Sequence, residues 1–378
     1  MRYLSMLVKP ASAACDMACS YCFYRDLARG RERGCRPVMD RPVMEAVVSR
    51  AFEAVPDGTV AFDFQGGEPT LAGLDFFEAF IEEVERRRGG RRVSYAIQTN
   101  GLALDERWCE FLGRNRFLVG VSLDGTRRLH DRLRPAADGG ATWSRVAASL
   151  GRLRGHGVEP AVLCVLSSEL ARHPQQVYRG LASLGARHVQ FIPCLGPAEG
   201  GDGSPRSAEM ASHALTPERF AHFYRGFLDA WERGQAEDGP MAVGLFDDVM
   251  GLSLGRRPRT CGALGACAPQ FVVESDGSVY PCDFYASDRW CMGNVCSDPI
   301  EAMAAGAVVE GFLSRPRRAG CDAPCADCGF EGICHGGCPR LSTAFAADGR
   351  CGYREFLEYG YGRLARRARE RVGRMPWA

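Results

Sequence analysis

Lysine is almost absent from this sequence of 378 residues. Lys9 is the only lysine, and arginine carries nearly all of the positive charge. A single lysine leaves little room for catalysis through a lysine Schiff base. Positive and negative side chains nearly cancel, to a formal net charge of +1. The totals therefore indicate neither a nucleic-acid partner nor a membrane-surface partner.

Long apolar runs are also missing. No apolar stretch approaches the roughly 18 residues that a membrane-spanning helix needs. Residues 1–15 resemble a lipoprotein signal only superficially, because the apolar stretch is short and Lys9 and Pro10 interrupt it. We therefore expect a cytoplasmic protein, in a reducing compartment that keeps cysteine thiols available for iron.

Cysteine, in contrast, is abundant, with 18 residues in the chain. A disulfide framework is typical of short secreted chains, and it fits poorly with a long chain of 46% hydrophobic content. Two blocks have spacing that favours metal clusters. The first block is Cys15, Cys19 and Cys22, and the second is Cys325, Cys328, Cys334 and Cys338, followed by Cys351. Short steps between thiolates let neighbouring cysteines bind irons of one cube.

The first block is the candidate for chemistry. Three closely spaced thiolates with no evident fourth leave one iron of a cube open to another ligand. The alternative for these cysteines is a zinc knuckle or simple packing thiols.

The first 200 residues alternate between strand-like and helix-like segments. Each strand candidate is short, apolar and bounded by turn residues or charge, as in buried parallel strands. The candidates are Tyr3–Val8, Thr59–Phe64, Val93–Gln98, Phe117–Leu123, Ala161–Leu166 and His188–Pro193. Six such units predict an α/β fold, either an incomplete barrel or an open doubly wound sheet. In both, ligands bind beyond the carboxyl ends of the strands.

Helices are expected between these strands. Asp40 is placed to cap a helix with one apolar face, and a second apolar stripe runs from Phe76 to Val84. Residues 196–215 are rich in Gly, Ser and Pro and are expected to form a loop. A helix that carries Phe220, Phe223, Tyr224, Phe227 and Trp231 is expected to follow it. Beyond residue 255 the sequence favours short hairpins, such as the one turning at Asp276 and Gly277. We expect a core domain over residues 1–235 and a domain organised by metal over residues 236–378.

The run Cys15-x3-Cys19-x2-Cys22, followed by Phe23 and Tyr24, resembles the signature of radical S-adenosylmethionine (SAM) enzymes. The resemblance implies a partial (β/α)6 barrel of the TIM type. In that family three thiolates hold a [4Fe–4S] cluster whose fourth iron binds SAM. Reductive cleavage of SAM gives a 5′-deoxyadenosyl radical that abstracts a hydrogen atom. The cofactor supplies the difficult step, and the protein supplies binding and orientation.

The segment Gln65-Gly66-Gly67-Glu68-Pro69 looks like the GGE segment of the same family. Glycines at a strand end let the backbone approach a ligand closely, and Glu68 is placed to accept a hydrogen bond from the SAM ammonium. Arg134 is a candidate partner of the SAM carboxylate, with a plain surface charge as the alternative. The SAM-binding residues that the resemblance implies are Tyr21, Gly66, Gly67, Glu68, Asn100, Ser122, Arg134 and Leu195.

The C-terminal cysteines resemble the seven-cysteine extension known as SPASM. The resemblance implies two auxiliary [4Fe–4S] clusters, and therefore three clusters in total. The first would use Cys261, Cys267, Cys282 and Cys338, and the second Cys325, Cys328, Cys334 and Cys351. Spacing alone does not reveal this crossed pairing. The remaining cysteines are expected to be free or packing thiols, with Cys321 the strongest competitor as a ligand: Cys35, Cys109, Cys164, Cys194, Cys291, Cys296 and Cys321.

Within this family the sequence is most similar to the anaerobic sulfatase-maturating enzymes. The segments that carry this similarity are Lys9–Ser12, Tyr21–Tyr24, Gln65–Leu71 and Gln270–Tyr285. These enzymes oxidise a Cys or Ser within a Cys/Ser-x-Pro-x-Arg motif of a sulfatase to Cα-formylglycine. The resemblance places the general base at Asp283 and substrate contacts at Tyr24 and Gln65. It also implies electron transfer to the auxiliary clusters and a low-potential electron donor of the flavodoxin or ferredoxin type.

Two other functions fit parts of the pattern. A SPASM enzyme could instead form thioether or carbon–carbon cross-links in a ribosomal peptide. A non-catalytic iron–sulfur electron carrier would need neither an open three-cysteine cluster nor a GGE segment.

Overall fold

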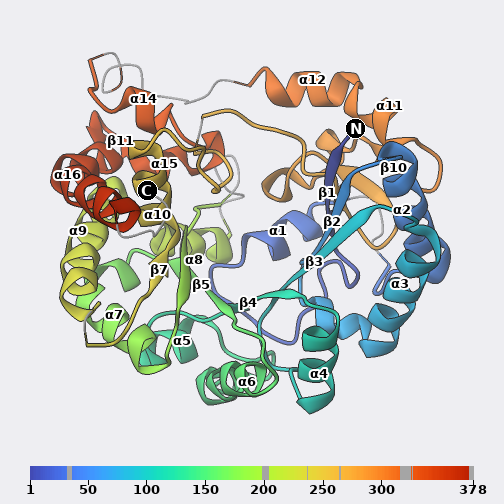
Figure 1. Cartoon of the computed structure of the whole chain (residues 1–378), viewed down its shortest axis with the longest axis horizontal. Coiled ribbons are helices and arrows are strands. Elements are labelled where there is room, and N and C mark those ends of the chain that lie inside the picture. Colours follow the sequence, from blue (N-terminus) through green and yellow to red (C-terminus); the bar gives the residue numbers. More distant parts are fainter. Residues whose placement is uncertain are drawn as a thin grey trace. The chain divides into compact units, whose positions relative to one another are not determined.

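The computed structural model describes residues 1–31, 36–197, 204–235, 237–263, 265–315, 325 and 327–373. Cys35 and Cys321, expected to be free thiols, lie outside the described residues. The chain forms two compact units, each assembled from three segments (Figure 1). The first unit contains Met1–Ser122, Arg134–Pro160 and Ala268–Arg315. The second contains Leu123–Leu133, Ala161–Cys267 and Pro316–Ala378.

The first unit is built on a sheet with the strand order β10-β9-β8-β1-β2-β3-β4. Strands β1 to β4 are parallel, and β8 joins the free edge of β1 in the same direction. The short strands β9 and β10 continue the sheet in antiparallel pairs. The strands are β1 (Tyr3–Val8), β2 (Thr59–Phe64), β3 (Arg92–Thr99), β4 (Leu118–Ser122), β8 (Val272–Val273), β9 (Ser278–Tyr280) and β10 (Gly293–Asn294).

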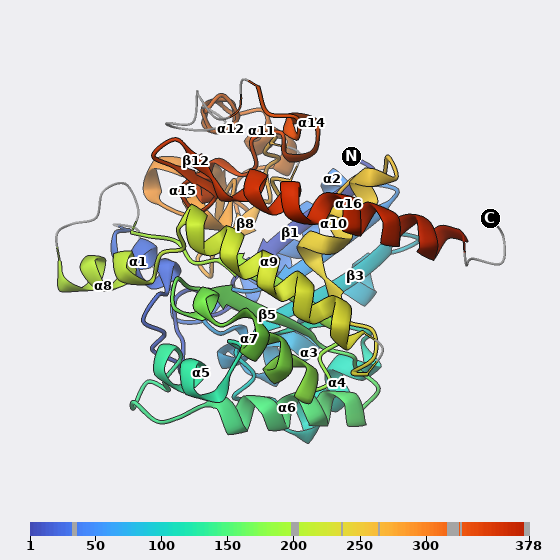
Figure 2. The ribbon, with the colours of Figure 1, turned by 90° about the vertical axis from the view of Figure 1, so that its left-hand side faces the viewer.

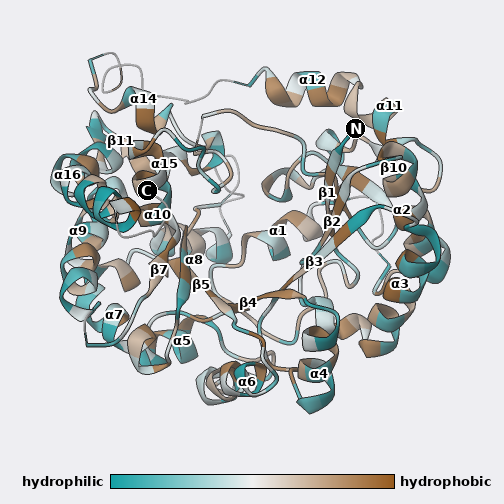
Figure 3. Cartoon of the chain, viewed as in Figure 1, coloured by the Kyte–Doolittle hydropathy of each residue, from teal (hydrophilic) through white to brown (hydrophobic). Residues whose placement is uncertain are grey.

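Helices of the first unit follow its strands. They are α1 (Phe23–Arg29), α2 (Arg41–Ala54), α3 (Leu74–Arg87), α4 (Glu106–Arg114), α6 (Trp143–Gly155), α11 (Ile300–Ala304) and α12 (Ala307–Leu313). Asp40 caps α2 by accepting from the amide of Val43, as predicted. Phe80 of α3 packs against Phe64 of β2 with a ring distance of 5.0 Å. Figure 3 shows hydrophilic residues on the outer turns of α3 and hydrophobic ones along β1.

The second unit carries three parallel strands in the order β5-β6-β7. They are β5 (Ala161–Leu166), β6 (His188–Pro193) and β7 (Ala242–Val243), and a small hairpin joins β11 (Ala346–Ala347) to β12 (Arg350–Cys351). Helix α9 (Pro217–Gly234) lies between α7 (Pro174–Ser183) and α16 (Gly352–Gly373), as Figure 2 shows. The other helices are α5 (Arg127–Leu133), α8 (Pro205–His213), α10 (Gly244–Ser253), α14 (Glu331–Cys334) and α15 (Ser342–Phe345).

The six predicted strands are confirmed, with the ends of β3 and β4 shifted by one residue. The hairpin at Gly277 is confirmed as β8 and β9. The prediction of a loop over residues 196–215 is wrong, because α8 forms within it. Ser204 caps this helix and Pro205 occupies its first turn, so two residues that suggested a loop in fact start a helix. Within the described residues, no helix is both long and apolar enough to span a membrane.

Candidate functional site

The first three cysteines lie in the loop that leaves the carboxyl end of β1. This loop folds back on the end of β2 through two short backbone hydrogen bonds. The amide of Gly67 donates to the carbonyl of Ser12 at 2.6 Å, and the amide of Glu68 donates to that of Ala14 at 2.7 Å. The GGE segment and the cysteine loop are therefore one local structure, at the edge of the sheet where parallel strands place ligands.

The two glycines are required by this close approach. A Cβ on Gly67 would lie 2.1 Å from the carbonyl oxygen of Ala14, and a Cβ on Gly66 would lie 2.9 Å from that of Ser12. Gly66 also has a φ of +136°. The sequence suggested that these glycines let the backbone approach a ligand closely. The structure shows that they also let the backbone approach the chain's own cysteine loop closely.

Hydrogen-bond donors point at the sulfurs of this loop. The amide of Met17 lies 3.4 Å from Sγ of Cys15, and Nδ2 of Asn100 lies 3.9 Å from the same sulfur. Nη1 of Arg134 lies 3.8 Å from Sγ of Cys19. Hydrogen bonds to the sulfurs are one of the factors by which a protein sets the reduction potential of an iron–sulfur cluster. Burial raises the pKa of the Cys15 thiol to about 12.

Glu68, one of the residues predicted to bind SAM, is fully buried. Its Oε1 accepts from the hydroxyls of Thr70 and Thr99, and its Oε2 accepts from the amide of Asn100 at 2.7 Å. Burial raises the pKa of Glu68. The carboxylate thus holds the ends of β2 and β3 together, and its contact with SAM stays a prediction.

Two other predicted SAM residues lie at the same edge of the first unit, and a third belongs to the second unit. Ser122 ends β4 and accepts from Nε2 of Gln98 at 2.9 Å. Tyr21 lies in the cysteine loop, with the guanidinium of Arg134 over its ring at 5.5 Å. Leu195 follows β6 in the second unit and is buried there. The roles of these residues toward SAM stay predictions.

The predicted base lies beside the predicted substrate residue Gln65. Asp283 begins a short 3-10 helix, η4 (Asp283–Tyr285), directly after Cys282. Its Oδ2 accepts from Nε2 of Gln65 at 3.0 Å, and its Oδ1 lies 2.5 Å from Nζ of Lys9. The parallel pairing of β8 with β1 brings this region next to Lys9, since Val8 and Val273 are partners in the register.

Glu274 is the second acid in this cluster. It accepts from the hydroxyl of Tyr24 at 2.7 Å and from that of Ser12 at 2.8 Å, and Nη1 of Arg31 lies 2.9 Å away. Burial acts most strongly and would raise the pKa of Glu274. The charges of Lys9 and Arg31, together with the hydrogen bonds from Tyr24 and Ser12, outweigh it and hold this pKa below the ordinary value. The hydroxyl of Tyr24 is thus already engaged, and its predicted contact with substrate stays untested.

Sequence reasoning missed Lys9 and Glu274 as members of this site. The sequence shows that Lys9 is the only lysine, but this fact led only to the exclusion of Schiff-base chemistry. Nothing in the sequence signalled that the residue after β1 faces the residue after β8, because that contact depends on a pairing between distant strands.

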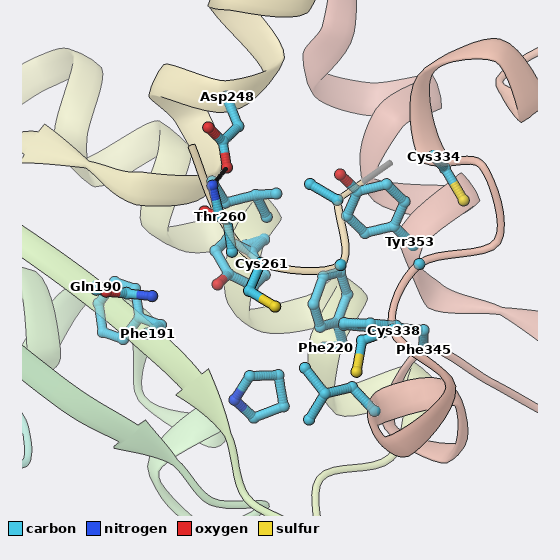
Figure 4. A pocket seen from close by; sticks show the side chains of 17 residues that line it. Gln190, Phe191, Phe220, Asp248, Thr260, Cys261, Cys334, Cys338, Phe345 and Tyr353 are labelled. Atoms are coloured by element: carbon cyan, nitrogen blue, oxygen red, sulfur yellow. Dashed lines mark hydrogen bonds between the residues drawn. The ribbon is translucent and has the colours of Figure 1, made fainter. Parts of the chain in front are cut away.

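The second unit gathers part of the auxiliary cysteine set around a cavity of about 90 Å³. Figure 4 shows the sulfurs of Cys261 and Cys338 directed into this cavity, while the sulfur of Cys334 lies away from them. Burial of the thiol raises the pKa of Cys261, and the neighbouring thiols of Cys338 and Cys267 raise it further. Asp248 holds the segment that precedes Cys261, because its carboxylate accepts a hydrogen bond from the amide of Thr260.

A second cavity in the same unit is lined by four cysteines, namely Cys325, Cys328, Cys334 and Cys351. Cys351 directly precedes α16, and the amide of Arg354 in the first turn lies 3.4 Å from its sulfur. A helix N-terminus stabilises negative charge, so this position suits a thiolate. The four residues match the set that the resemblance assigned to the second auxiliary cluster. Cys282, assigned to the other auxiliary cluster, belongs to the first unit.

Among the described residues, no group of three or more His, Cys, Asp and Glu side chains is arranged to hold a single metal ion. A cube presents its irons at separate corners, and its thiolates are correspondingly spread. The thiol chemistry, the donors to sulfur and the cysteine-lined cavity fit iron–sulfur clusters better than a mononuclear site.

Comparison with known proteins adds independent information. Residues 10–169 match the Radical SAM superfamily, and residues 266–329 match an iron–sulfur cluster-binding domain, SPASM. A cysteine-type anaerobic sulfatase-maturating enzyme of Clostridium novyi is 36% identical, over 90% of this chain and 89% of the relative. A serine-type enzyme of Bacteroides thetaiotaomicron is 28% identical, over 95% of this chain and 87% of the relative.

A solved structure, "Native anSMEcpe with bound AdoMet and Kp18Cys peptide", superposes with a TM-score of 0.85. It is 32% identical, and the match covers 97% of this chain and 99% of that one. The fold is therefore the predicted one, a partial TIM-like radical SAM barrel with a C-terminal SPASM domain. The peptide-binding protein SuiB superposes at 0.58 with 15% identity, which shows a shared fold only.

Proposed function

Since this chain belongs to the anaerobic sulfatase-maturating enzymes, a radical SAM family, we propose that it oxidises a Cys or Ser side chain of a sulfatase to Cα-formylglycine. The target would lie in a Cys/Ser-x-Pro-x-Arg motif. The higher identity to the cysteine-type relative than to the serine-type one makes a cysteine peptide the first substrate to test.

The cofactors we propose are SAM and three [4Fe–4S] clusters. Cys15, Cys19 and Cys22 would hold the SAM-binding cluster, and the two auxiliary clusters would use the eight C-terminal cysteines in the crossed pairing given above. The separate directions of the Cys334 and Cys338 sulfurs support this pairing (Figure 4). We keep residues 1–235 as the proposed core domain and residues 236–378 as the proposed auxiliary-cluster domain.

The reaction needs a group that accepts one proton. When bound, SAM and the clusters would provide two parts of the chemistry: the abstraction of a hydrogen atom from the substrate β-carbon and the uptake of one electron. Asp283 accepts the proton of the thiol or hydroxyl. Together these losses oxidise the side chain by two electrons. Cysteine gives a thioaldehyde, from which water releases hydrogen sulfide to leave the aldehyde, whereas serine gives the aldehyde directly.

The observation that carries this proposal is the setting of Asp283. Its carboxylate is held by Gln65 from the carboxyl end of β2, in the unit that also contains the first three cysteines. The side chain keeps 14% of its surface exposed, while Lys9 behind it is fully buried. A substrate side chain can therefore reach the carboxylate from the open side.

The test uses the protein with its clusters reconstituted under anaerobic conditions, given SAM, a low-potential reductant and paired Cys-x-Pro-x-Arg and Ser-x-Pro-x-Arg peptides. Mass spectrometry should show an aldehyde product and 5′-deoxyadenosine. A product that loses only hydrogen and keeps its sulfur would favour cross-link formation instead. Absence of 5′-deoxyadenosine would favour an electron carrier. A flavodoxin or a ferredoxin replacing the chemical reductant would test the proposed electron donor.

A further inference from the structure

The only lysine of the chain is buried between two acids. Nζ of Lys9 lies 2.5 Å from Oδ1 of Asp283 and 3.6 Å from Oε1 of Glu274. It also lies over the ring of Tyr24, 3.4 Å from the ring centroid. None of the Lys9 side chain is exposed. A buried ammonium is retained at a large desolvation cost, so these contacts must compensate for it.

The two acids depend on Lys9 to different degrees. Glu274 has a second cation, Arg31, and two hydroxyl donors, from Tyr24 and Ser12. For Asp283, Lys9 is the only cation within ion-pair distance among the described residues, and Gln65 provides a hydrogen bond to the other oxygen. Loss of Lys9 would therefore leave Glu274 largely paired but would release one side of Asp283.

The surroundings favour lysine over arginine. A Cβ on Gly66 would lie 3.2 Å from Cβ of Lys9, which shows how closely the chain passes the stem of this side chain. The ring of Tyr24 closes the space over the ammonium. A planar guanidinium is larger and donates in a fixed fork, whereas an ammonium is a compact point charge. In a chain that otherwise uses arginine, lysine at this position fits a confined space.

We propose that Lys9 is a positioning residue for Asp283. Lys9 at Oδ1 and Gln65 at Oδ2 hold the carboxylate from two sides, in one orientation, with its exposed edge toward the substrate. Oδ1 is buried, but Oδ2 has a second lone pair beside the hydrogen bond from Gln65, so capacity remains to accept the substrate proton. This inference rests on the proposed function, because it assumes that Asp283 receives that proton.

The test compares Lys9→Met, Lys9→Gln and Lys9→Arg with the native enzyme, all with reconstituted clusters. The readout is the ratio of peptide aldehyde to 5′-deoxyadenosine formed in one reaction. We expect Lys9→Met to keep SAM cleavage and iron content while the ratio falls roughly ten- to hundredfold, with kcat lowered more than the KM for the peptide. Lys9→Gln should lie between Lys9→Met and the native enzyme, and Lys9→Arg should not restore the ratio.

The control is Arg50→Gln, which removes a cation of the first unit whose partner, Glu53, lies outside this buried cluster. It should leave the ratio unchanged. If Lys9→Met does not fold, Lys9→Gln provides the comparison, since it keeps a neutral donor of similar length. An unchanged ratio in the Lys9 variants, or an equal fall in Arg50→Gln, would overturn the proposal.

A double variant separates positioning from general damage. In an Asp283→Asn background, adding Lys9→Met should lower the ratio no further, because the residue that Lys9 positions is already disabled. An additional fall would contradict the proposal. If the native enzyme itself makes no aldehyde, the proposed function fails. If the native enzyme makes aldehyde and Lys9→Met does so equally well, only the inference on Lys9 fails.

Discussion

Gly67 lies against the backbone of Ala14, so closely that a Cβ built on it would lie 2.1 Å from the carbonyl oxygen of Ala14. The amide of Gly67 donates to Ser12 in the same loop, at 2.6 Å. This contact joins the end of β2 to the loop that carries the first three cysteines. The GGE segment therefore supports the cysteine loop as well as any ligand.

Gly67→Ala should displace that loop. We expect a loss of about 3 kcal/mol in the free energy of unfolding, because the added methyl meets backbone that cannot move aside, together with loss of iron from the first block. Thermal denaturation and iron analysis measure the two effects. Gly90→Ala is the control, since a Cβ there meets nothing within 4 Å. Native iron content in Gly67→Ala would show that the close approach is dispensable.

Asp283→Asn should separate SAM cleavage from peptide oxidation. The amide keeps the shape of the side chain but accepts no proton, and its NH2 group is a donor where the carboxylate had an acceptor oxygen. We expect all three clusters and 5′-deoxyadenosine to be retained, while aldehyde falls by roughly 100-fold or more. Quantitative mass spectrometry of both products checks this. Asp288→Asn, a neighbouring carboxylate in the same segment, serves as control. Undiminished aldehyde would remove Asp283 from the role of base.

Cys15→Ala should abolish SAM cleavage without affecting the C-terminal clusters. Because the cysteine blocks lie in separate parts of the sequence, we expect about eight irons per chain instead of about twelve. Iron analysis and detection of 5′-deoxyadenosine test this outcome. Cys109→Ala removes a buried thiol of α4 outside both blocks and should change neither result. Iron near zero in Cys15→Ala would mean that the clusters assemble together.

Glu274→Gln should destabilise the first unit. It removes the charge that Arg31 and Lys9 share, and leaving buried cations without this partner typically costs about 3–5 kcal/mol. A fall in Tm should report the loss. Glu53→Gln breaks an ion pair with Arg50 in which Glu53 is 53% exposed, and it should change stability by less than about 1 kcal/mol. An equal loss of stability in the two variants would contradict the expectation that the buried ion pairs of Glu274 stabilise the unit more than the exposed pair of Glu53.

Local patterns in the sequence were sufficient for the strands and for much of the site. Apolar runs between turn residues gave β1, β2, β5 and β6 with their observed ends, because each run is short, rich in apolar residues and bounded by turn residues or charge. Helix α8 was missed because Ser204 and Pro205 serve equally in loops and in first helical turns.

By itself, the sequence determined the cysteine blocks, the GGE segment and the family that they resemble, since these depend on residue types at short spacing. Only the tertiary structure decided that Lys9 meets Asp283 and Glu274. That contact exists because β8 pairs with β1, in a register that puts Val273 beside Val8. Pairing between distant strands is set by the packing of the whole sheet, and no local periodicity encodes it.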